Sequence, residues 1–277
     1  QAMLASDVSG LNELAGPRNY HQQSSWRLIR KTIRKAIIMK LYLMQLATLQ
    51  PDDIPVPSYL VQTDEGKNVL IDSGFPESFV GNPIELPGGR KVEMSAENFI
   101  VNRLSSIGLR PEDIDTVICT HLDADHAGGH AAFLNAEFIV QRTQYEIARE
   151  SEHPRFAALR GEWDLPSLRY RIVEGDSELI PGIGLIETSG HVPGHQAVLV
   201  RLPETGAVLL AIDAIPHSSM LDADTRWVMP IDMDEKETRK STRKLTEIAK
   251  RENVKLFVHG HDAEQWKTLK HAPEFYS

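Results

Sequence analysis

The sequence contains only one cysteine, Cys119, among its 277 residues. A single thiol cannot form a disulfide within the chain, and its place in the apolar run TVIC at 116–119 predicts a buried strand residue. Structural disulfides are typical of oxidising compartments and rare in the cytosol. We therefore expect a cytoplasmic protein.

The sequence also lacks a long hydrophobic run. A membrane-spanning helix needs about 20 consecutive apolar residues. The longest candidate, KAIIMKLYLMQLA at 35–47, is shorter than that and is interrupted by Lys40. The composition, 41% hydrophobic and 25% charged, is typical of a soluble globular domain with a sizeable core. Membrane insertion is therefore not expected.

Positive charge is scarce outside the N-terminal region. Residues 1–40 contain 7 Lys/Arg and 2 Asp/Glu, and the rest contain 23 and 37, a balance of 23 − 37 = −14. A surface of this sign repels phosphate backbones. We expect no nucleic-acid partner.

Nucleotide-binding and serine-hydrolase motifs are absent, since there is no G-x-G-x-x-G, Walker or G-x-S-x-G sequence. From residue 40 the pattern predicts short strands interspersed with helices, which favours a layered α/β fold over a simple Rossmann sheet. The expected strands lie at 40–47, 57–63, 68–74, 114–120, 137–141, 182–190, 196–202, 207–213 and 254–262. The expected helices lie at 95–108, 142–150, 233–253 and 263–270.

Histidine and aspartate cluster just after these strands. The stretch CTHLDADHAGGH at 119–130 is followed by SGHVPGH at 189–195, by Asp213 and by VHGHD at 258–262. Buried polar groups at this density are costly unless something binds them. Imidazole and carboxylate ligands suit Zn²⁺, Fe or Mn, and seven such groups suffice for two ions.

In this order of residues the chain resembles the metallo-β-lactamase superfamily of hydrolases, and within it the N-acyl-homoserine lactonases, which degrade quorum-sensing signals (quorum quenching). The resemblance covers about residues 40–277. It is carried by the stretches LIDSGFPES, DADHAGGHAAF, EFIVQRTQYE, GHVPGHQ, VLLAIDA, GHDAEQ and PEFYS. It implies an αββα four-layer sandwich and two divalent metal ions, Zn²⁺ first, with Fe or Mn as alternatives.

The resemblance also implies a role for each of the clustered residues. One ion would be held by His121, Asp123 and His191, and the second by Asp125, His126 and His261. Asp213 would bridge the two ions, and His195 would orient a ligand from behind. His259 falls where the family has an apolar residue and is not expected to bind metal.

Asp123 departs from the family pattern, which has a histidine at this position. A carboxylate oxygen is two bonds from Cβ, as is histidine Nδ1, so aspartate can reach the same ion. Flavodiiron proteins in the same superfamily also place a carboxylate here. The extra negative charge predicts ions that are weaker Lewis acids, bound water of higher pKa, and easier use of Fe²⁺ or Mn²⁺.

The chemistry that the resemblance implies is the opening of lactones, or cleavage of carboxylic esters, by a hydroxide held between the ions. Asp125 would orient the hydroxide and pass a proton to the leaving oxygen. The lactonases carry a tyrosine three residues after the bridging aspartate, where this chain has Pro216. His217 is the candidate replacement, and this departure weakens the case for homoserine lactones in particular.

The substrate contacts are sought in the segments 75–92, 153–170 and 214–230. Phe79 and Trp227, with His217, are our candidates, and the apolar residues Phe75, Leu86, Phe156, Trp163, Leu165, Met220 and Met229 lie in the same segments. Several of these could instead pack the core or a homodimer interface. The expected partner is a small lactone or ester.

Other functions remain open alongside the lactonase. The same scaffold supports hydrolysis of phosphodiesters, phosphotriesters or aryl esters, for which Arg90, Arg155 and Arg169 are the cations to inspect. A flavodiiron-like redox role is suggested by Asp123 alone, and no appended flavin module is present. A non-catalytic scaffold is the remaining alternative.

Residues 1–38 differ from the rest and form a separate segment before the hydrolase domain at 39–277. The stretch SSWRLIRKTIRKAII is basic and has near-helical apolar spacing. Three interpretations fit: a docking helix for a partner, a leader preceding a start at Met39, or a membrane-surface or transit segment.

Overall fold

The computed structural model describes residues 39–86 and 89–277. The expectations for residues 1–38 lie outside the described residues, so the domain boundary at 39 stays a prediction. In the described part of the chain, no helix is both long and apolar enough to span a bilayer.

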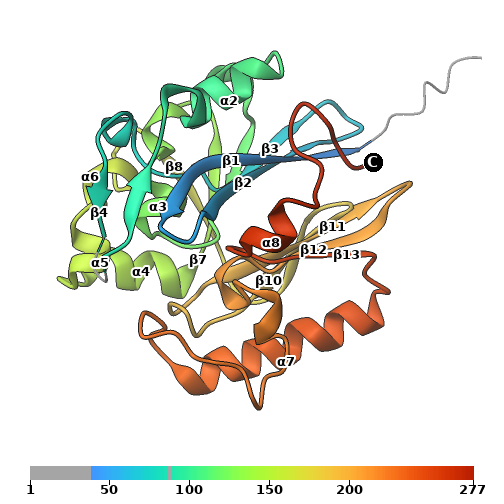
Figure 1. Cartoon of the computed structure of the whole chain (residues 1–277). Coiled ribbons are helices and arrows are strands. Elements are labelled where there is room, and N and C mark those ends of the chain that lie inside the picture. Colours follow the sequence, from blue (N-terminus) through green and yellow to red (C-terminus); the bar gives the residue numbers. More distant parts are fainter. Residues whose placement is uncertain (1–38, 87–88) are drawn as a thin grey trace, which may run out of the picture. The chain divides into compact units, whose positions relative to one another are not determined.

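Two β-sheets form the centre of the fold (Figure 1). The larger sheet has the strand order β4-β5-β1-β2-β3-β6-β7-β8 and the smaller the order β13-β12-β11-β10-β9. The strands are β1 (Lys40–Gln50), β2 (Ile54–Gln62), β3 (Asn68–Ile71), β4 (Ile84–Glu85), β5 (Lys91–Glu93), β6 (Thr116–Ile118), β7 (Glu137–Gln141), β8 (Arg169–Val173), β9 (Ser177–Ile180), β10 (Ile183–Glu187), β11 (Gln196–Leu202), β12 (Gly206–Leu210) and β13 (Leu256–Val258).

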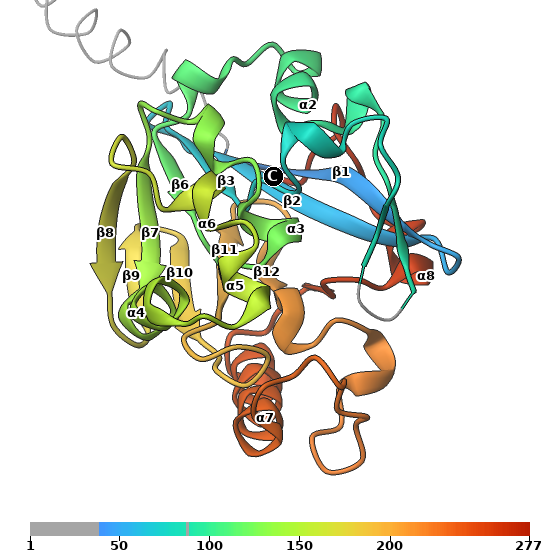
Figure 2. The same ribbon diagram turned by 90° about the vertical axis from the view of Figure 1, so that its left-hand side faces the viewer.

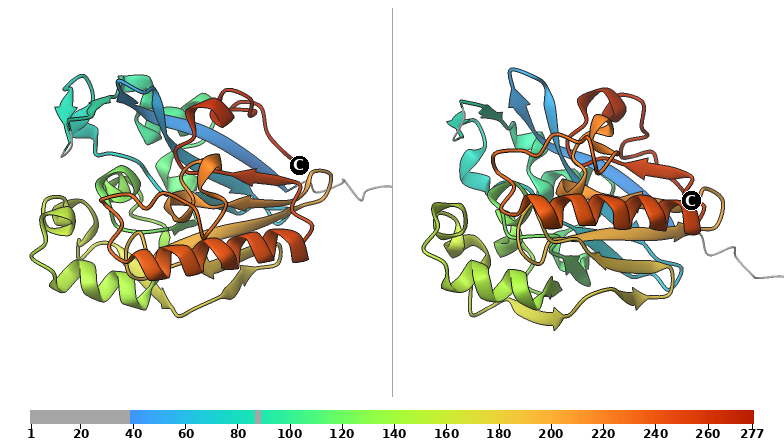
Figure 3. Two further views of the ribbon diagram at one scale, coloured as in Figure 1. Left: turned by 60° about the horizontal axis from the view of Figure 1, so that its bottom comes forward. Right: turned by 90° about the horizontal axis from the view of Figure 1, so that it is seen from below.

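Helices lie on the outer faces of the sheets. Among the described residues the α-helices are α2 (Ile100–Ser106), α3 (Ala124–Ala127), α4 (Arg142–Glu150), α5 (Pro154–Ala157), α6 (Arg160–Trp163), α7 (Glu235–Arg251) and α8 (Ala263–Trp266). The 3₁₀ turns are η1 (Glu77–Phe79), η2 (Ala96–Asn98), η3 (Pro111–Asp113), η4 (His130–Ala132), η5 (Ile212–Ala214) and η6 (Ser218–Met220). Figure 3 shows α7 running along the outer face of the smaller sheet.

Three apolar clusters define the layers. Strand residues such as Leu43, Ile71, Val198 and Leu210 form the cluster between the two sheets. A second cluster packs the opposite face of the larger sheet against its helices, and a third packs α7 on the smaller sheet through Leu245. This is the predicted αββα sandwich, and the fold prediction is confirmed.

Parallel pairing places the site. β3, β6 and β7 are mutually parallel neighbours, and β12 pairs parallel to β13. The carboxyl ends of parallel strands meet at one edge of a sheet, where loops carry functional groups. The loops after β6, β12 and β13 therefore bring residues that are distant in sequence to the same edge (Figure 2).

The helix predicted at 95–108 is divided in the structure, so that prediction is partly wrong. Ser95 and Asn98 bond reciprocally and close the short turn η2, and Phe99 then adopts an extended conformation before α2 begins. Phe99 is 8% exposed, and burying its ring against the core outweighs helix continuity.

His130 lies buried beneath the site, and we expect it to make stability depend on pH. Its Nδ1 is 2.7 Å from Ser73 Oγ and its Nε2 is 3.2 Å from Cys119 Sγ. Burial and the nearby His126 lower the pKa of His130 to about 4, against the opposing effect of Asp72. The folded state thus favours neutral His130. The stability that this residue contributes is fully present above its unfolded pKa of about 6.5, and it is lost as the pH falls from there toward 4.

Between pH 7.5 and pH 5 this amounts to about 2 kcal/mol of unfolding free energy. Urea unfolding of the full chain in EDTA should therefore show that the wild type loses unfolding free energy between these two pH values. The loss should be about 2 kcal/mol smaller in His130→Gln. Equal losses in the two proteins would contradict the assignment to His130.

Candidate metal centre

Seven ligand-type side chains converge at the loop edge of the two sheets. His121, Asp123, Asp125 and His126 follow β6, the last two on α3, and His191 lies in the turn between β10 and β11. Asp213 lies on η5 directly after β12, and His261 follows β13. These are the residues that the sequence predicted, and the fold brings all seven together.

The seven residues form overlapping groups whose donor atoms lie within 4.8 Å of one another. One group is His121, Asp123 and His191, and another is Asp125, His126 and His261. A third joins His121, His126 and Asp213. The division into two triads with Asp213 between them matches the arrangement expected from the sequence.

Asp213 faces both triads with different oxygens. Its Oδ1 lies 3.0 Å from His261 Nε2 and 3.5 Å from His126 Nε2. Its Oδ2 lies 3.2 Å from His191 Nε2 and 3.9 Å from His121 Nε2. One carboxylate therefore lies between the two ends of the site, as a bridging ligand would.

Hydrogen bonds behind the rings fix the four histidines in one tautomer. His126 Nδ1 donates to Asp72 at 2.8 Å, and His191 Nδ1 donates to Asp232 at 2.8 Å. His261 Nδ1 donates to the Pro55 carbonyl at 2.8 Å. Since these oxygens can only accept, the neutral form of each ring has its Nε2 lone pair directed into the site.

His121 is held in the same way through a relay. Thr120 Oγ1 donates to Asp72 Oδ2 at 2.6 Å and lies 3.1 Å from His121 Nδ1. Asp72 thus supports histidines of both triads. Asp72 was not among the site residues predicted from the sequence, although an aspartate at the end of an apolar strand could have marked it.

The carboxylates make the site attractive to cations. Burial lowers the pKa of His126, but Asp125, Asp213 and Asp72 outweigh it and raise the pKa to about 10. At His191 burial also lowers the pKa, but Asp213, Asp123 and Asp232 outweigh it and raise the pKa to about 9. Although burial raises the pKa of Asp213, His261, His126 and His191 hold it well below its usual range.

A metal fits these donors, because several point inward without a partner. Within the described residues, His121 Nε2, His126 Nε2 and Asp213 Oδ1 are buried and accept no hydrogen bond. Buried nitrogen and oxygen atoms without partners are costly and rare in proteins. Mixed imidazole and carboxylate donors of this kind suit divalent transition metals.

Arg155 also enters the site. From the sequence, this arginine was a candidate only for contacts with phosphate substrates. Its Nε and one terminal nitrogen contact the two Asp123 oxygens at 2.6 and 2.5 Å. The expectation of weaker Lewis acids counted three carboxylates and no cation. Arg155 adds one positive charge beside them, −3 + 1 = −2, and the expectation of weaker Lewis acids stays a prediction.

Unusual backbone conformations place the ligands. Ile212 has φ +51°, a strained value for a β-branched residue, and Asp213 follows it directly. A Cβ at Gly260 would lie 2.5 Å from the Ile212 carbonyl oxygen. Glycine at 260 therefore lets the loop carrying His261 approach the bridging aspartate closely.

The other predicted residues lie around this centre. His195 is buried, its ring centroid is 5.0 Å from that of His121, and its Nδ1 contacts Thr188 Oγ1 at 2.8 Å. It supports His121 by packing, and its role stays a prediction. His259 bonds to the Ile215 carbonyl at 3.2 Å and is outside the donor groups, as expected.

The candidate substrate contacts have different environments. His217 Nδ1 accepts the Ser219 amide at 3.1 Å, so its Nε2 carries the proton and can donate. Phe79 is half-buried and stacks on Phe75 at 5.2 Å, and Trp227 is 62% exposed. Of the neighbouring apolar candidates, Phe75, Phe156 and Trp163 are core residues. Substrate contact by His217, Phe79 and Trp227 stays a prediction.

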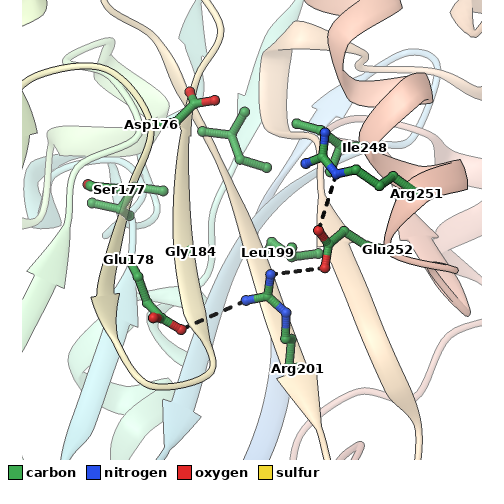
Figure 4. Close-up of a pocket in the computed structure, with 11 residues that line it drawn as sticks. Asp176, Ser177, Glu178, Gly184, Leu199, Arg201, Ile248, Arg251 and Glu252 are labelled. Atoms are coloured by element: carbon green, nitrogen blue, oxygen red, sulfur yellow. Dashed lines mark hydrogen bonds and ion pairs between the residues drawn. The ribbon is translucent and has the colours of Figure 1, made fainter.

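A separate groove of about 390 Å³ lies on the smaller sheet beside the end of α7 (Figure 4). Arg201 in this groove pairs with Glu252 at 3.0 Å and with Glu178 at 4.0 Å. Its two arginines, Arg201 and Arg251, pair with Glu178 and Glu252, and it contains none of the seven clustered residues. It is therefore not the candidate site.

Comparison with known proteins identifies the family. The family described as "Metallo-beta-lactamase superfamily" matches residues 51–261. An N-acyl homoserine lactonase from Bacillus sp is 40% identical over 83% of this chain and 91% of its own length. Another from Bacillus thuringiensis is 39% identical over 80% of this chain and 87% of its own.

A solved structure of an N-acyl homoserine lactone hydrolase is similar as a whole. That structure carries the product N-hexanoyl-L-homoserine at its catalytic metal centre, has a TM-score of 0.76 and 34% identity, and is matched over 86% of this chain and 99% of that chain. The resemblance expected from the sequence motifs is confirmed. The chain belongs to the metallo-beta-lactamase superfamily and, within it, to the family of the N-acyl homoserine lactonases.

Proposed function

We propose that this protein is a metal-dependent hydrolase that opens lactones, with N-acyl homoserine lactones as the first substrates to test. The observation that carries the proposal is the pair of donor triads on either side of Asp213. The relatives named as lactonases direct the choice of substrate class. Two divalent ions complete the proposed site, Zn²⁺ first and Fe or Mn as alternatives.

Divalent ions held by these donors would supply a water molecule of lowered pKa and polarise the substrate carbonyl. Asp125 is 21% exposed, against 9% for Asp123 and 7% for Asp213, and so is the carboxylate best placed to meet substrate. It would take the proton of the attacking water as the new carbon–oxygen bond forms. It would then return that proton to the ring oxygen as the lactone bond breaks.

The segment 221–233, between η6 and α7, is the proposed acyl-binding surface. Leu221, Trp227, Ile231 and Met233 are all exposed there, with Trp227 62% exposed. Asp232 in the same segment bonds to His191, so this apolar surface is tied to the site. Exposed apolar patches of this kind are typical of ligand-binding regions. His217 and Phe79 remain the other proposed contacts.

Phosphate esters receive less support as substrates. Arg90 pairs with Asp52 at 3.3 Å, and Arg169 donates to the Asn135 carbonyl at 2.5 Å. Arg155 is engaged by Asp123. Each of the three arginines thus already has an acceptor within the protein. A cytoplasmic location and a homodimer stay predictions from the sequence.

The test is a hydrolysis panel with N-acyl homoserine lactones, other γ- and δ-lactones, aryl esters and phosphotriesters. We expect lactone opening that EDTA lowers by roughly 10³-fold or more and that Zn²⁺, Mn²⁺ or Fe²⁺ restores. A pH-stat assay measures the acid released. EDTA-resistant lactone opening, or turnover of phosphotriesters alone, would contradict the proposal.

A further inference from the structure

Arg155 makes contacts that place a fixed positive charge at one end of the site. Besides its two bonds to Asp123, a terminal nitrogen lies 2.6 Å from His191 Nε2. The other terminal nitrogen donates to the Ile231 carbonyl at 2.5 Å. The side chain is 10% exposed. The guanidinium is therefore held firmly against two of the three donors of the His121/Asp123/His191 end.

The contact with His191 excludes simultaneous binding of a metal by the same atom. In the neutral ring of His191, the form that can bind a metal, Nδ1 donates its proton to Asp232 and Nε2 carries one in-plane lone pair. Guanidinium nitrogens can only donate hydrogen bonds, and the 2.6 Å contact uses that lone pair. His191 can give it to Arg155 or to an ion at this end, but not to both.

Asp123 adds an electrostatic reason. Its two oxygens retain further lone pairs, so the bidentate contact does not block coordination by itself. Its negative charge, however, is already balanced by Arg155. An ion entering this end would face a buried guanidinium of the same sign at close range, in a site where charges are poorly screened.

In the described part of the chain, the Asp125/His126/His261 end has no arginine or lysine among its contacts. His126 Nε2 and Asp213 Oδ1 are buried there without a hydrogen-bond partner, and His261 Nε2 lies 3.8 Å from Asp125. The donor residues of that end are a carboxylate and two imidazoles. The two ends thus differ in what already occupies their donors.

We propose that the Arg155 guanidinium competes with a metal ion for the His121/Asp123/His191 end. The Asp125/His126/His261 end then binds the first ion tightly, and a second ion binds weakly because it must displace Arg155. This rests on the proposed metal dependence. It makes the Asp123–Arg155 pair the feature by which this chain differs from a site with histidine at 123.

Displacement of Arg155 would also affect the proposed acyl-binding surface. The guanidinium bonds to the Ile231 carbonyl, one residue before Asp232. Withdrawal of the side chain would release that backbone. Filling of the second end is therefore linked to the segment 221–233.

The experiment is Zn²⁺ titration of the EDTA-stripped and dialysed full chain by calorimetry, with metal content measured after gel filtration. We expect the wild type to bind one equivalent tightly and a second roughly 10²-fold more weakly. Arg155→Met keeps the apolar stem and removes the donors, and it should tighten the second step by about tenfold or more. Arg169→Met, an arginine outside the cluster, is the matched control and should behave as the wild type.

A second variant, Asp123→His, removes the partner of Arg155 and should also bind two equivalents with similar affinity. It tests the inference even if Arg155→Met fails to fold, which circular dichroism would show. Two steps of similar affinity in the wild type, or a second step that Arg155→Met leaves unchanged or weakens, would overturn the competition. Chelator-sensitive lactone opening in that case would leave the proposed function standing, whereas a wild type that binds no zinc would overturn both.

Discussion

Substitution of Asp213 by asparagine is expected to lower kcat/KM for a lactone by roughly 10³-fold or more and to reduce the bound metal. Its two carboxylate oxygens lie 3.0 Å from His261 Nε2 and 3.2 Å from His191 Nε2. An amide keeps one oxygen but turns an NH₂ group toward the other nitrogen. It also removes the charge that lies between the two ends.

The measurement combines pH-stat kinetics with metal analysis of Asp213→Asn. Asp64→Asn, an exposed aspartate in the turn between β2 and β3, is the control and should keep both activity and metal. Because the change is isosteric, circular dichroism should match the wild type. Full activity and full metal content in Asp213→Asn would remove Asp213 from the site.

Substitution of Asp125 by asparagine should lower kcat by about 10²–10⁴-fold, the usual contribution of a general acid or base. Asp125 Oδ2 lies 3.6 Å from His126 Nε2 and 3.8 Å from His261 Nε2, and its side chain is the most exposed of the three site carboxylates. Asparagine keeps an oxygen donor but cannot accept and return a proton at neutral pH. Metal binding should therefore survive better than turnover.

The assay is repeated at saturating Zn²⁺ to separate the two roles of Asp125. If excess metal restores the wild-type rate, Asp125 acts only as a ligand and the proton-transfer role is wrong. A persistent loss with metal bound supports that role. Para-nitrophenyl acetate serves as a second substrate in the same comparison.

Several elements could be predicted from the sequence because local signals and packing agree. The strand at 137–141 and the helix at 142–150 have the predicted bounds. The apolar run EFIVQ is buried in the sheet, and the following segment is amphipathic with a helical period. The helix at 95–108 failed because Phe99 packs into the core, a contact that no local pattern reveals.

The strands β8 and β9 were missed for a similar reason. RYRIV and SELI contain charged or polar residues at every exposed position, and both are strands at sheet edges. A strand at the edge is half-solvated and shows weaker hydrophobic alternation. Pairing with β7 and β10 decides these conformations, since an isolated short strand is not stable.

The donors of the site were visible in the sequence, but their supports were not. Singly these histidines and aspartates could be caps or loop residues, but their types and order at successive strand ends sufficed to predict a metal site. Asp72, Asp232 and Arg155 are common residues in ordinary loops. Only their distances to His126, His191 and Asp123 give them a role.

The sequence by itself determined the family, the layered fold and the seven candidate donors, because strand patterns and ligand chemistry are local properties of the chain. Tertiary structure decided which groups hold each ring, which oxygen of Asp213 faces which triad, and that Arg155 balances Asp123. These depend on side chains that are far apart in sequence meeting in a buried volume, where a lone pair or a charge can be shared by only one partner. The meeting of Arg155 with Asp123, 32 residues earlier, is the contact on which the proposed difference between the two ends of the site depends.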